Sequence, residues 1–388
     1  MGSVRIEGSK IQMNYYEAET NINAFLSVED WEEEARRKLG AGPFGYVHGG
    51  AGAGHTMRAN LEAFYSYRIV PRICSDISHR DLSVELLGMK VGSPFLLAPI
   101  GVNSILHPDA ELAPAKAAAK FGIPYILSNV SSKSMEEVAE AAGDSLRWFQ
   151  LYPPKDRRLT ASLLSRAEKS GYAAIVVTVD STMLGWRETD LHNSYLPFLK
   201  GHGMGNYFTD PIFKEMLEQP PEKNLKHAVL KALEEGNNTC FTWKEFDFIK
   251  SNTRLPVLVK GLTHPEDARE ALQHGVDGIV VSNHGGRQLD GAIGTLEALP
   301  EIIKAVDGAV PVLLDSGIRR GADVIKAIAL GAAAVLIGRP YAYALAVAGQ
   351  AGVEAVIQKL YAETEIQLGV SGKSRIRDLD ANLLQKMP

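Results

Sequence analysis

The stretch VPVLLDSGIRRGADVIKAIALGAAAVLIGR, residues 310–339, holds one complete structural repeat of the chain. An apolar run from Val310 leads to Asp315, an amphipathic segment follows, and Gly331 precedes a second apolar run that ends at Ile337. Short apolar runs bounded by Gly, Pro or Asp predict buried strands, and the segment between them predicts a helix. Strands that are apolar on both faces are typical of parallel sheets covered by helices, so this stretch predicts a βαβ unit.

The same alternation recurs along the chain from residue 95 onward. Eight apolar runs are expected to form strands: Phe95–Pro99, Tyr125–Ser128, Arg147–Leu151, Ala174–Val179, Val257–Lys260, Gly278–Ser282, Val310–Asp315 and Ala333–Ile337. Eight consecutive βα units predict an α/β fold, a TIM (β/α)8 barrel. A doubly wound sheet is the alternative, but it would leave the polar residues that follow the strands without a common face.

The segments between these runs carry signals for helix starts and ends. Three of them fit the S/T-x-x-E capping box that begins a helix: Ser134–Glu137, Thr242–Glu245 and Thr263–Glu266. Four glycines stand between a helical pattern and the next strand, where a left-handed residue is needed: Gly122, Gly171, Gly275 and Gly331. Both signals support helices that alternate with the strands.

Two parts of the chain lie outside the repeat. Residues 1–94 are expected to form an N-terminal extension that caps the barrel, with a helix from Ser27 to Leu39, a glycine-rich loop from Gly40 to Gly54 and a second helix around 58–67. The barrel itself takes residues 95–388, so the chain is expected to be a single domain overall.

The second part is an insertion after the fourth strand. The connection from Asp180 to Pro256 is far longer than a usual crossover, and residues 186–241 show no sustained periodicity. We predict a long loop here. It is either a lid over the barrel mouth or a surface insertion that makes oligomer contacts.

Composition excludes several classes of function. The 388 residues carry 41 Lys and Arg against 46 Asp and Glu, a formal net charge of −5 with no basic run, which argues against a nucleic-acid or acidic-membrane partner. The two cysteines, Cys74 and Cys240, fit neither a disulfide framework nor a metal site. The N-terminus lacks a signal-peptide pattern, and the longest apolar stretch, 327–338, is too short to span a bilayer. We expect a cytoplasmic protein without a metal.

Polar side chains follow most of the predicted strands, where a TIM barrel carries its chemistry. They are Gln150, Tyr152, Thr178, Asp180, Arg187, Lys260, Ser282, His284, Arg287, Asp315, Arg319 and Arg339. A single His or Lys at such a place is more often structural than catalytic. The concentration of so many on one face favours an active site.

The last two strands indicate a phosphate site. Gly317 with Arg319, and Gly338 with Arg339, combine a glycine that lets backbone N–H groups approach a ligand with a guanidinium that forks onto phosphate oxygens. Asp315 beside them would accept hydrogen bonds from sugar-like hydroxyls. The pattern therefore predicts a ligand with both a polyol chain and a phosphate.

The remaining polar residues indicate a small anionic acid. Arg187 and Arg287 suit a carboxylate, and His284 suits proton removal. Lys260 would be either a Schiff-base lysine, as in an aldolase, or a fixed positive charge beside an electron-rich ring. Spacing alone leaves both readings of Lys260 open.

The segment Ser282-Asn-His-Gly-Gly-Arg-Gln-Leu-Asp290 closely resembles the active-site signature of the FMN-dependent L-2-hydroxy acid oxidising family. The resemblance covers roughly residues 25–380. Supporting segments are Leu97–Gly101, Phe149–Tyr152, Thr178–Asp180, Leu184–Arg187, Val259–Lys260, Asp315–Gly321 and Ile337–Arg339. It implies an FMN-dependent oxidoreductase that acts on a small L-2-hydroxy acid and O2, in a homo-oligomer, a tetramer or octamer.

The resemblance also implies a role for each residue of an FMN site. The phosphate would be held by Gly317, Arg319, Gly338 and Arg339, with Asp315 at the ribityl chain. The isoalloxazine ring would contact Ala98, Pro99, Ile100, Gly101, Ser128, Gln150, Thr178 and Ser282. Lys260 would lie at the N1–C2 carbonyl edge, where negative charge grows during reduction.

For the substrate, the resemblance places Tyr46, Arg187 and Arg287 on the carboxylate and Tyr152 on the α-hydroxyl. His284 would be the base, with Asp180 orienting it and stabilising its imidazolium form. These residues, with Lys260, are the predicted catalytic and substrate-binding set.

Two positions bear on the branch of the family. Val130 stands where a related oxidase has a tryptophan, and Gly101 is a glycine where oxidases usually carry alanine. These features and the long insertion resemble the branch that converts L-lactate and O2 to acetate, CO2 and water. The alternative is the branch that releases pyruvate and hydrogen peroxide, and a Schiff-base aldolase that uses Lys260 is a distant third.

Overall fold

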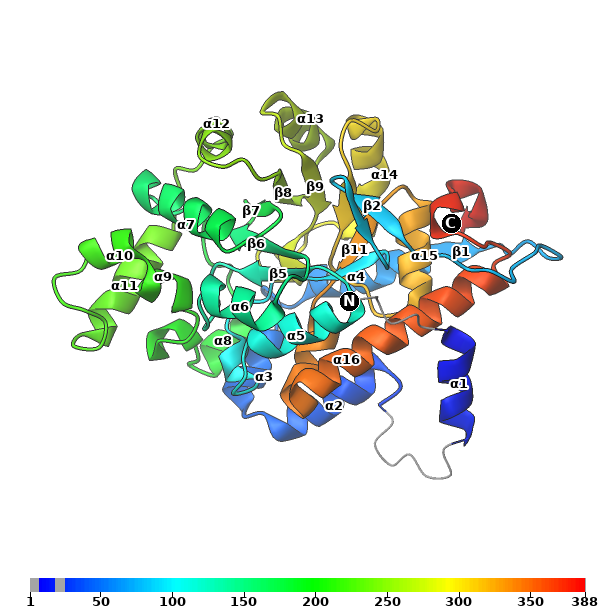
Figure 1. The fold of residues 1–388 in the computed structure, drawn as a ribbon, viewed down its shortest axis with the longest axis horizontal. Helices are drawn as coiled ribbons and strands as arrows, with labels where there is room; N and C mark the ends of the chain where they lie inside the picture. The colour runs from blue at the N-terminus through cyan, green and yellow to red at the C-terminus, as the bar shows by residue number, and fades with distance from the viewer. Residues whose placement is uncertain (1–6, 18–24, 388) are drawn as a thin grey trace.

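A computed structural model of the chain describes residues 7–17 and 25–387 (Figure 1). The described strands are β1 (Tyr67–Ile69), β2 (Val84–Leu86), β3 (Met89–Val91), β4 (Phe95–Leu97), β5 (Tyr125–Ser128), β6 (Arg147–Leu151), β7 (Ile175–Thr178), β8 (Val257–Leu262), β9 (Gly278–Val281), β10 (Val312–Leu314), β11 (Ala334–Ile337) and β12 (Leu384–Lys386). The described α-helices are α1 (Gly8–Glu17), α2 (Val28–Lys38), α3 (Ala41–His48), α4 (His55–Tyr65), α5 (Leu112–Phe121), α6 (Met135–Ala142), α7 (Arg157–Lys169), α8 (Glu188–His192), α9 (Gly205–Thr209), α10 (Pro211–Glu215), α11 (Leu225–Gly236), α12 (Lys244–Ser251), α13 (Pro265–Gln273), α14 (Thr295–Val306), α15 (Gly321–Ala329) and α16 (Arg339–Val370). Short 3-10 turns are η1 (Asn103–Ile105), η2 (Pro197–Lys200), η3 (His284–Gly286), η4 (Ile376–Asp378) and η5 (Ala381–Leu383).

Strands β4 to β11 form a closed parallel barrel in chain order. The predicted TIM barrel is therefore confirmed, and each of the eight predicted runs contains or overlaps one barrel strand. The register sets residues side by side at the carboxyl ends, for example Ser128 opposite Gln150 and Thr178 opposite Lys260. A doubly wound sheet is excluded by the closure of β9 on β10 and of β11 on β4.

The barrel interior is a layer of apolar side chains, one from each strand. These residues are Leu96, Ile126, Trp148, Val176, Leu258, Val280, Leu313 and Leu336, all buried together. Side chains two residues apart on a strand point to the same face, so the next inward layer is known from the register. It consists of Ala98, Ser128, Gln150, Thr178, Lys260, Ser282, Asp315 and Gly338. The barrel therefore changes from apolar to polar at its carboxyl end.

The amino end of the barrel is closed by the extension. Leu86 and Val91 of the antiparallel β2–β3 pair are fully buried against the interior layer. β1 pairs with β12, which ties the later part of the extension to residues near the C-terminus. This arrangement leaves the carboxyl end as the open end of the barrel.

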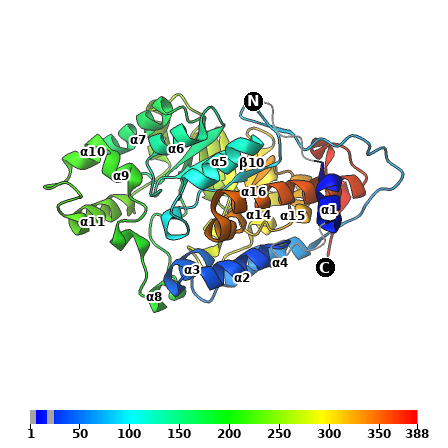
Figure 2. The same ribbon diagram turned by 60° about the horizontal axis from the view of Figure 1, so that its bottom comes forward.

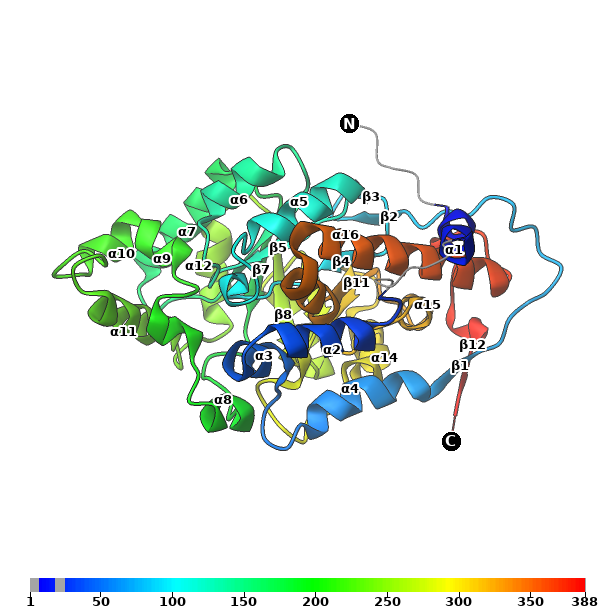
Figure 3. The same cartoon turned by 90° about the horizontal axis from the view of Figure 1, so that it is seen from below.

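The extension contains the two predicted helices, α2 and α4, and two that were not predicted, α1 and α3. α2 begins after Ser27, which forms a capping box with Asp30. The glycine-rich segment, expected to be a loop, contains α3 instead, so that expectation was wrong. A Cβ on Gly42 would lie 2.5 Å from Tyr195, which shows that this glycine serves close packing of α3 against the insertion. Figures 2 and 3 show α2, α3 and α4 in a row along one side of the barrel, with α8 beside α3.

The insertion after β7 is not the long loop that the sequence predicted. It folds into α8, η2, α9, α10 and α11, and α9–α11 extend from one end of the molecule (Figure 1). All of these elements except the 12-residue α11 have five residues or fewer, and most of their stability comes from tertiary contacts, so they leave a weak periodic signal in the sequence. This is the physical reason why the prediction failed.

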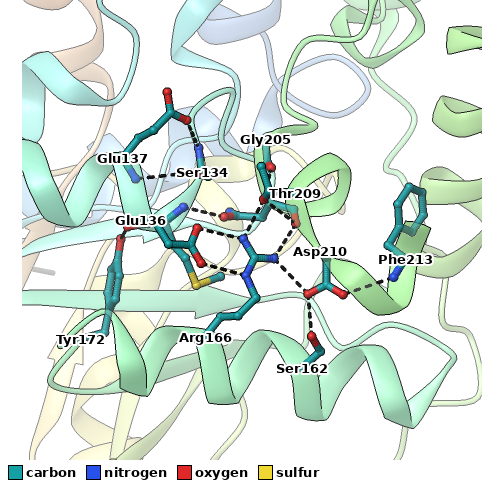
Figure 4. A network of polar contacts seen from close by, with 12 residues as sticks. Ser134, Glu136, Glu137, Ser162, Arg166, Tyr172, Gly205, Thr209, Asp210 and Phe213 are labelled. Atoms are coloured by element: carbon teal, nitrogen blue, oxygen red, sulfur yellow. Dashed lines mark hydrogen bonds and ion pairs between the residues drawn. The ribbon is translucent and has the colours of Figure 1, made fainter. Parts of the chain in front are cut away.

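A polar network holds the middle of the insertion on the barrel (Figure 4). Arg166 of α7 donates to Glu136 of α6, to the fully buried Asp210 and to Thr209. Asp210 also accepts the backbone N–H of Phe213, which caps α10. The network fixes α9 and α10 against α6 and α7.

The predicted helix signals have mixed outcomes. Ser134 forms a full capping box with Glu137, as predicted. However, α12 begins after Trp243 and α13 after His264, so Thr242 and Thr263 are not the caps and those two predictions were wrong. The four predicted glycine positions all have positive φ, from 63° at Gly122 to 105° at Gly331, which confirms them. Within residues 7–17 and 25–387, no helix has the length and apolar character that a membrane span requires.

Candidate active site

A cavity of about 480 Å³ opens at the carboxyl end of the barrel. The predicted site residues that line it are Tyr46, Ala98, Pro99, Ile100, Gly101, Tyr152, Arg187, Lys260, His284, Arg287, Asp315, Gly317, Arg319, Gly338 and Arg339. Four others, Ser128, Gln150, Thr178 and Ser282, are buried in the polar inward layer of the barrel. Asp180 stands behind His284. The fold thus gathers the predicted residues from all eight barrel strands and α3 at one end of the barrel.

His284 is held between a carboxylate and a phenol. Its Nδ1 lies 2.8 Å from Asp180 Oδ1 and 3.0 Å from Ser181 Oγ, and its Nε2 lies 3.4 Å from Tyr152 Oη. His284 also has a φ of 57°, a sparsely populated value for a residue with a side chain and one often found at functional sites. The carboxylate only accepts, so it assigns the proton to Nδ1 and leaves Nε2 with its lone pair toward the cavity.

The electrostatics of this pair suit a base. Burial alone would raise the pKa of Asp180, but the adjacent His284 and Lys260 charges and hydrogen bonds from His284 and Ser181 lower it to about 2. Burial lowers the pKa of His284, and the opposing attraction of Asp180 does not fully restore it. At neutral pH the imidazole is therefore neutral and Asp180 is ionised, so His284 is ready to accept a proton.

Two arginines face the cavity on the same side as Tyr46. Arg187 donates from Nε to the carbonyl of Arg287 at 3.1 Å and from Nη2 to Gln288 Oε1 at 2.8 Å. Arg287 donates to the Gly49 carbonyl at 2.6 Å, and its guanidinium carbon lies 5.0 Å from the centre of the Tyr46 ring. Burial and the nearby charge of Arg187 lower the pKa of Arg287 to about 9. An anion between the two arginines would relieve this repulsion.

The sequence did not single out Gln288 or Asp190, which flank these arginines. Gln288 donates to the carbonyls of Asp180 and Met183, so it joins the His284 side of the site to Arg187. Asp190 Oδ2 lies 4.0 Å from Arg187 Nη1, and burial raises the pKa of Asp190. Gln288 lies within the signature segment 282–290, so the sequence could have indicated it as a site residue. Asp190 lies in the poorly periodic insertion, where no sequence pattern indicated a site residue.

Lys260 is part of a buried ion pair. Its Nζ lies 3.2 Å from Asp315 Oδ2 and 2.9 Å from Ser282 Oγ. Burial would lower the pKa of Lys260, but Asp315 and Asp180 outweigh it and raise the pKa. The strand has a bulge at Gly261, whose φ is 116° and whose Cβ would lie 2.7 Å from Asp180. The ammonium is therefore a fixed positive charge in the mouth of the barrel.

The far end of the cavity carries the predicted phosphate residues. Gly317 has a φ of 100°, and a Cβ there would lie 2.4 Å from the carbonyl oxygen of Asn60, so only glycine fits. Arg319 donates to the carbonyl of Ile318, and Gly338 is the N-cap of α16. Arg339 donates to the carbonyls of Val47, Gly285 and Gly49, all at 3.0 Å. A helix N-terminus with two guanidinium groups favours an anion.

The polar layer contains hydrogen-bonding atoms that fit a flavin ring. Gln150 Nε2 and Thr178 Oγ1 are buried and have no hydrogen-bond partner among the described residues. An unsatisfied buried amide or hydroxyl is costly, and the ring of FMN offers carbonyl and N–H groups to satisfy both. Together with the cationic far end and the protonated Lys260, these atoms fit FMN.

Several cavity residues come from the insertion and were not among the predicted site residues. They are Leu196, Phe198, Met204, Tyr207, Leu233 and Asn237. All but Asn237 are apolar or aromatic, and they line the same cavity as His284. Only the aromatic content of the segment could have pointed to them.

Comparison with known proteins agrees with this geometry. The family model described as FMN-dependent dehydrogenase matches residues 35–386. The chain belongs to this family of FMN-dependent 2-hydroxy acid oxidoreductases. It is an oxidoreductase enzyme, and FMN is its cofactor.

Similar members of the family act on related acids. An L-lactate oxidase of Lysinibacillus sphaericus (strain C3-41) is 46% identical over 93% of this chain and 93% of its own length. An L-lactate oxidase of Nostoc sp. is 42% identical over 94% of this chain and 99% of its own length. The solved structure of a soluble mutant of the membrane-associated (S)-mandelate dehydrogenase from Pseudomonas putida has a TM-score of 0.82 and 35% identity, over 93% of this chain and 99% of that one. These similarities extend over nearly the whole chain.

Proposed function

We propose that this enzyme oxidises L-lactate to pyruvate and passes the electrons to O2, which becomes hydrogen peroxide. The observation that carries the proposal is the neutral His284, backed by Asp180, beside the Arg187–Arg287 pair in one cavity. A base and a carboxylate site side by side are what oxidation at the α-carbon of a hydroxy acid requires. The similarity to two L-lactate oxidases supports L-lactate as the acid and the oxidase reaction as the outcome.

Each substrate-binding or catalytic residue has its own proposed role. Arg187 and Arg287 bind the substrate carboxylate, with the Tyr46 phenol beside them. Tyr152 Oη hydrogen-bonds the α-hydroxyl, 3.4 Å from the imidazole. His284 Nε2 takes the proton that leaves the substrate, and Asp180 stabilises the imidazolium that results.

The cofactor is held by the polar layer and the far end of the cavity. Gly317, Arg319, Gly338 and Arg339 are proposed to hold the phosphate, and Asp315 the ribityl hydroxyls. Ala98, Pro99, Ile100, Gly101, Ser128, Gln150, Thr178 and Ser282 are proposed to surround the ring, with Lys260 at its N1–C2 edge. FMN supplies an acceptor for two electrons that O2 can regenerate.

A second candidate keeps pyruvate in the cavity, where hydrogen peroxide converts it to acetate, CO2 and water. This is the lactate 2-monooxygenase reaction, which the sequence favoured. Gly101 supports it, because the glycine at this position of the cavity wall resembles the monooxygenase branch, whereas oxidases usually carry alanine there. The insertion residues Phe198 and Leu233 also line the cavity and would slow product release. Similarity to the two L-lactate oxidases places this candidate second.

An aldolase mechanism has no such support. A Schiff base requires a neutral lysine amine, whereas Lys260 is paired with Asp315 at 3.2 Å and its pKa is raised. Lys260 therefore acts as a fixed charge.

The experiment that tests the proposal has two stages. Anaerobic addition of L-lactate to the FMN-loaded enzyme is expected to bleach the yellow flavin spectrum, and failure to bleach would refute the proposed activity. With O2 and catalase present, so that free peroxide cannot decarboxylate released pyruvate, the oxidase yields pyruvate. Acetate and CO2 in equal amounts under the same conditions would instead establish the monooxygenase. Light scattering on the same sample tests the predicted tetramer or octamer.

A further inference from the structure

Two turns meet at the cavity wall beside the ring-facing residues. Gly101 lies in the turn after β4, Val130 lies in the turn after β5, and both line the cavity. A Cβ on Gly101 would lie only 2.4 Å from Val130 Cγ2. Because the side chain of a β-branched residue has little rotational freedom, the distance between the two turns sets this contact. Whatever holds the turns together therefore shapes the wall.

The first turn has a backbone that needs support. Val102 has a φ of 72° and a ψ of 39°, a left-handed conformation that is a genuine outlier for a β-branched residue. Such conformations persist only when the surrounding structure enforces them. One tie is the hydrogen bond from Val102 N to the carbonyl of Val130 at 3.0 Å. Ser104 Oγ and Ser132 Oγ, 2.6 Å apart, form a second tie between the turns.

Glu111 provides two more ties. It stands at the N-cap of α5 and is fully buried. Its Oε1 accepts the backbone N–H of Asn103 at 2.9 Å, and its Oε2 accepts the backbone N–H of Lys133 at 3.1 Å. The first donor belongs to the turn of Gly101 and the second to the turn of Val130. One carboxylate thus spans both turns.

The position of Glu111 argues for this role over a simple packing role. Its carboxylate forms no ion pair among the described residues, and a buried carboxylate is tolerated only when hydrogen bonds replace its hydration. The backbone amides of the two turns are what compensates it. The chemistry of the site does not use Glu111, which lies outside the residues that line the cavity.

We propose that Glu111 is a positioning residue: its two carboxylate oxygens clamp the turns after β4 and β5 and so fix the Gly101–Val130 contact at the active-site wall. The importance of that wall for lactate oxidation rests on the proposed function. The clamp itself is a property of the fold and can be measured without lactate.

The test is a double-mutant cycle on FMN binding. Gly101→Ala in the otherwise unchanged protein forces Val130 away and is expected to weaken FMN binding by about tenfold, measured by fluorescence titration of the apoprotein. Glu111→Gln keeps the shape of the side chain but turns one acceptor into a donor, which releases one turn. In the Glu111→Gln background, Gly101→Ala is expected to weaken binding by less than about threefold, because the turns can separate.

Two control variants accompany the double-mutant cycle on FMN binding. Val130→Ala removes the clashing methyl groups directly, so Gly101→Ala in that background is expected to be mild. Glu365→Gln alters another buried carboxylate that joins distant segments, since Glu365 accepts from Gly8 N at 3.2 Å and pairs with Arg80 at 2.6 Å. Far from the site, it is expected to leave the full tenfold effect of Gly101→Ala in place.

Hydrogen exchange of the FMN-loaded protein gives an independent readout. In Glu111→Gln, the peptides that cover residues 99–106 and 129–134 are expected to exchange about tenfold faster or more, while the rest of the barrel stays protected. A uniform rise across the barrel, or a Gly101→Ala effect that is the same in both backgrounds, would overturn the proposal.

A further variant covers the case in which Glu111→Gln does not fold. Glu111→Asp keeps the charge but is too short to reach both turns, so the same two readouts apply to it with the same expected directions. The proposed function is tested by a separate experiment. A wild-type enzyme that L-lactate does not bleach would refute lactate oxidation, while the coupling between positions 101 and 111 would still be measurable.

Discussion

Replacing Asp180 with Asn is the sharpest test of the site. Asp180 Oδ1 lies 2.8 Å from His284 Nδ1, and Asn keeps an acceptor there but removes the negative charge. A hydrogen bond to a charged group contributes about 1.5–3 kcal/mol, and the neutral bond that replaces it contributes about 1 kcal/mol. The change therefore removes about 0.5–2 kcal/mol of support for the imidazolium.

This loss has two measurable effects: flavin reduction becomes slower, and the pKa of His284 falls. The imidazolium formed on proton transfer is less stable, so flavin reduction by L-lactate is expected to slow by about 2–30-fold on the pH plateau. Because Asp180 raises the pKa of His284 against the lowering by burial, its removal lowers that pKa further. The neutral base then survives to lower pH, and the acid limb of the rate profile moves to lower pH.

The assay is anaerobic stopped-flow reduction of the bound FMN across the range from about pH 5 to pH 9. Ser181→Ala is the matched control, because it removes one hydroxyl hydrogen bond to Asp180 and leaves the carboxylate charge in place. It is expected to slow reduction by about fivefold or less. A rate and an acid limb in Asp180→Asn equal to those of the wild type would refute the assignment of His284 as the base supported by Asp180.

Three further predictions concern the cofactor and the substrate. Thr178→Val removes a buried hydroxyl without a partner, so it is expected to raise the unfolding temperature of the apoprotein while weakening FMN binding about 5–10-fold; a less stable apoprotein with unchanged FMN affinity would contradict a contact between Thr178 and the ring. Arg187→Lys loses the fork that reaches Gln288 and the substrate, so the KM for L-lactate is expected to rise about tenfold or more at unchanged FMN content; an unchanged KM would remove Arg187 from the carboxylate site. Borohydride added with pyruvate or another carbonyl compound is expected to leave the protein mass unchanged, since Lys260 is protonated beside Asp315; a stable adduct on Lys260 would restore the aldolase interpretation.

The barrel was predictable because most residues of each strand are apolar. Tyr125–Ser128 and Arg147–Leu151 match β5 and β6 at both ends, and both faces of these strands are buried. The polar residues at the carboxyl ends of most strands stood out against these apolar runs. In the barrel, the inward side chains two residues beyond the apolar layer face a bound ligand and do not pack against other side chains.

The insertion and α3 were not predictable in this way. α9 and α10 have five residues each, too few to show a period, and they depend on Asp210, Asn206 and Arg166, which come together only in the fold. In α3 the glycines suggested a flexible loop, whereas Gly45 is needed because a Cβ would lie 2.6 Å from Asn193. The sequence alone does not distinguish a glycine required for close packing from a glycine required for a turn.

The network around Arg166 divides the insertion into two arms. Its middle is fixed to α6 and α7, and the C-terminal end of α11 is fixed separately, through Glu235, to the backbone N–H groups of Lys155 and Asp156. One arm brings Phe198 and Met204 to the cavity, and the other brings Leu233 and Asn237. Each arm therefore has its own attachment to the barrel, and a substitution within one arm is expected to reshape one part of the cavity wall and leave the other part in place.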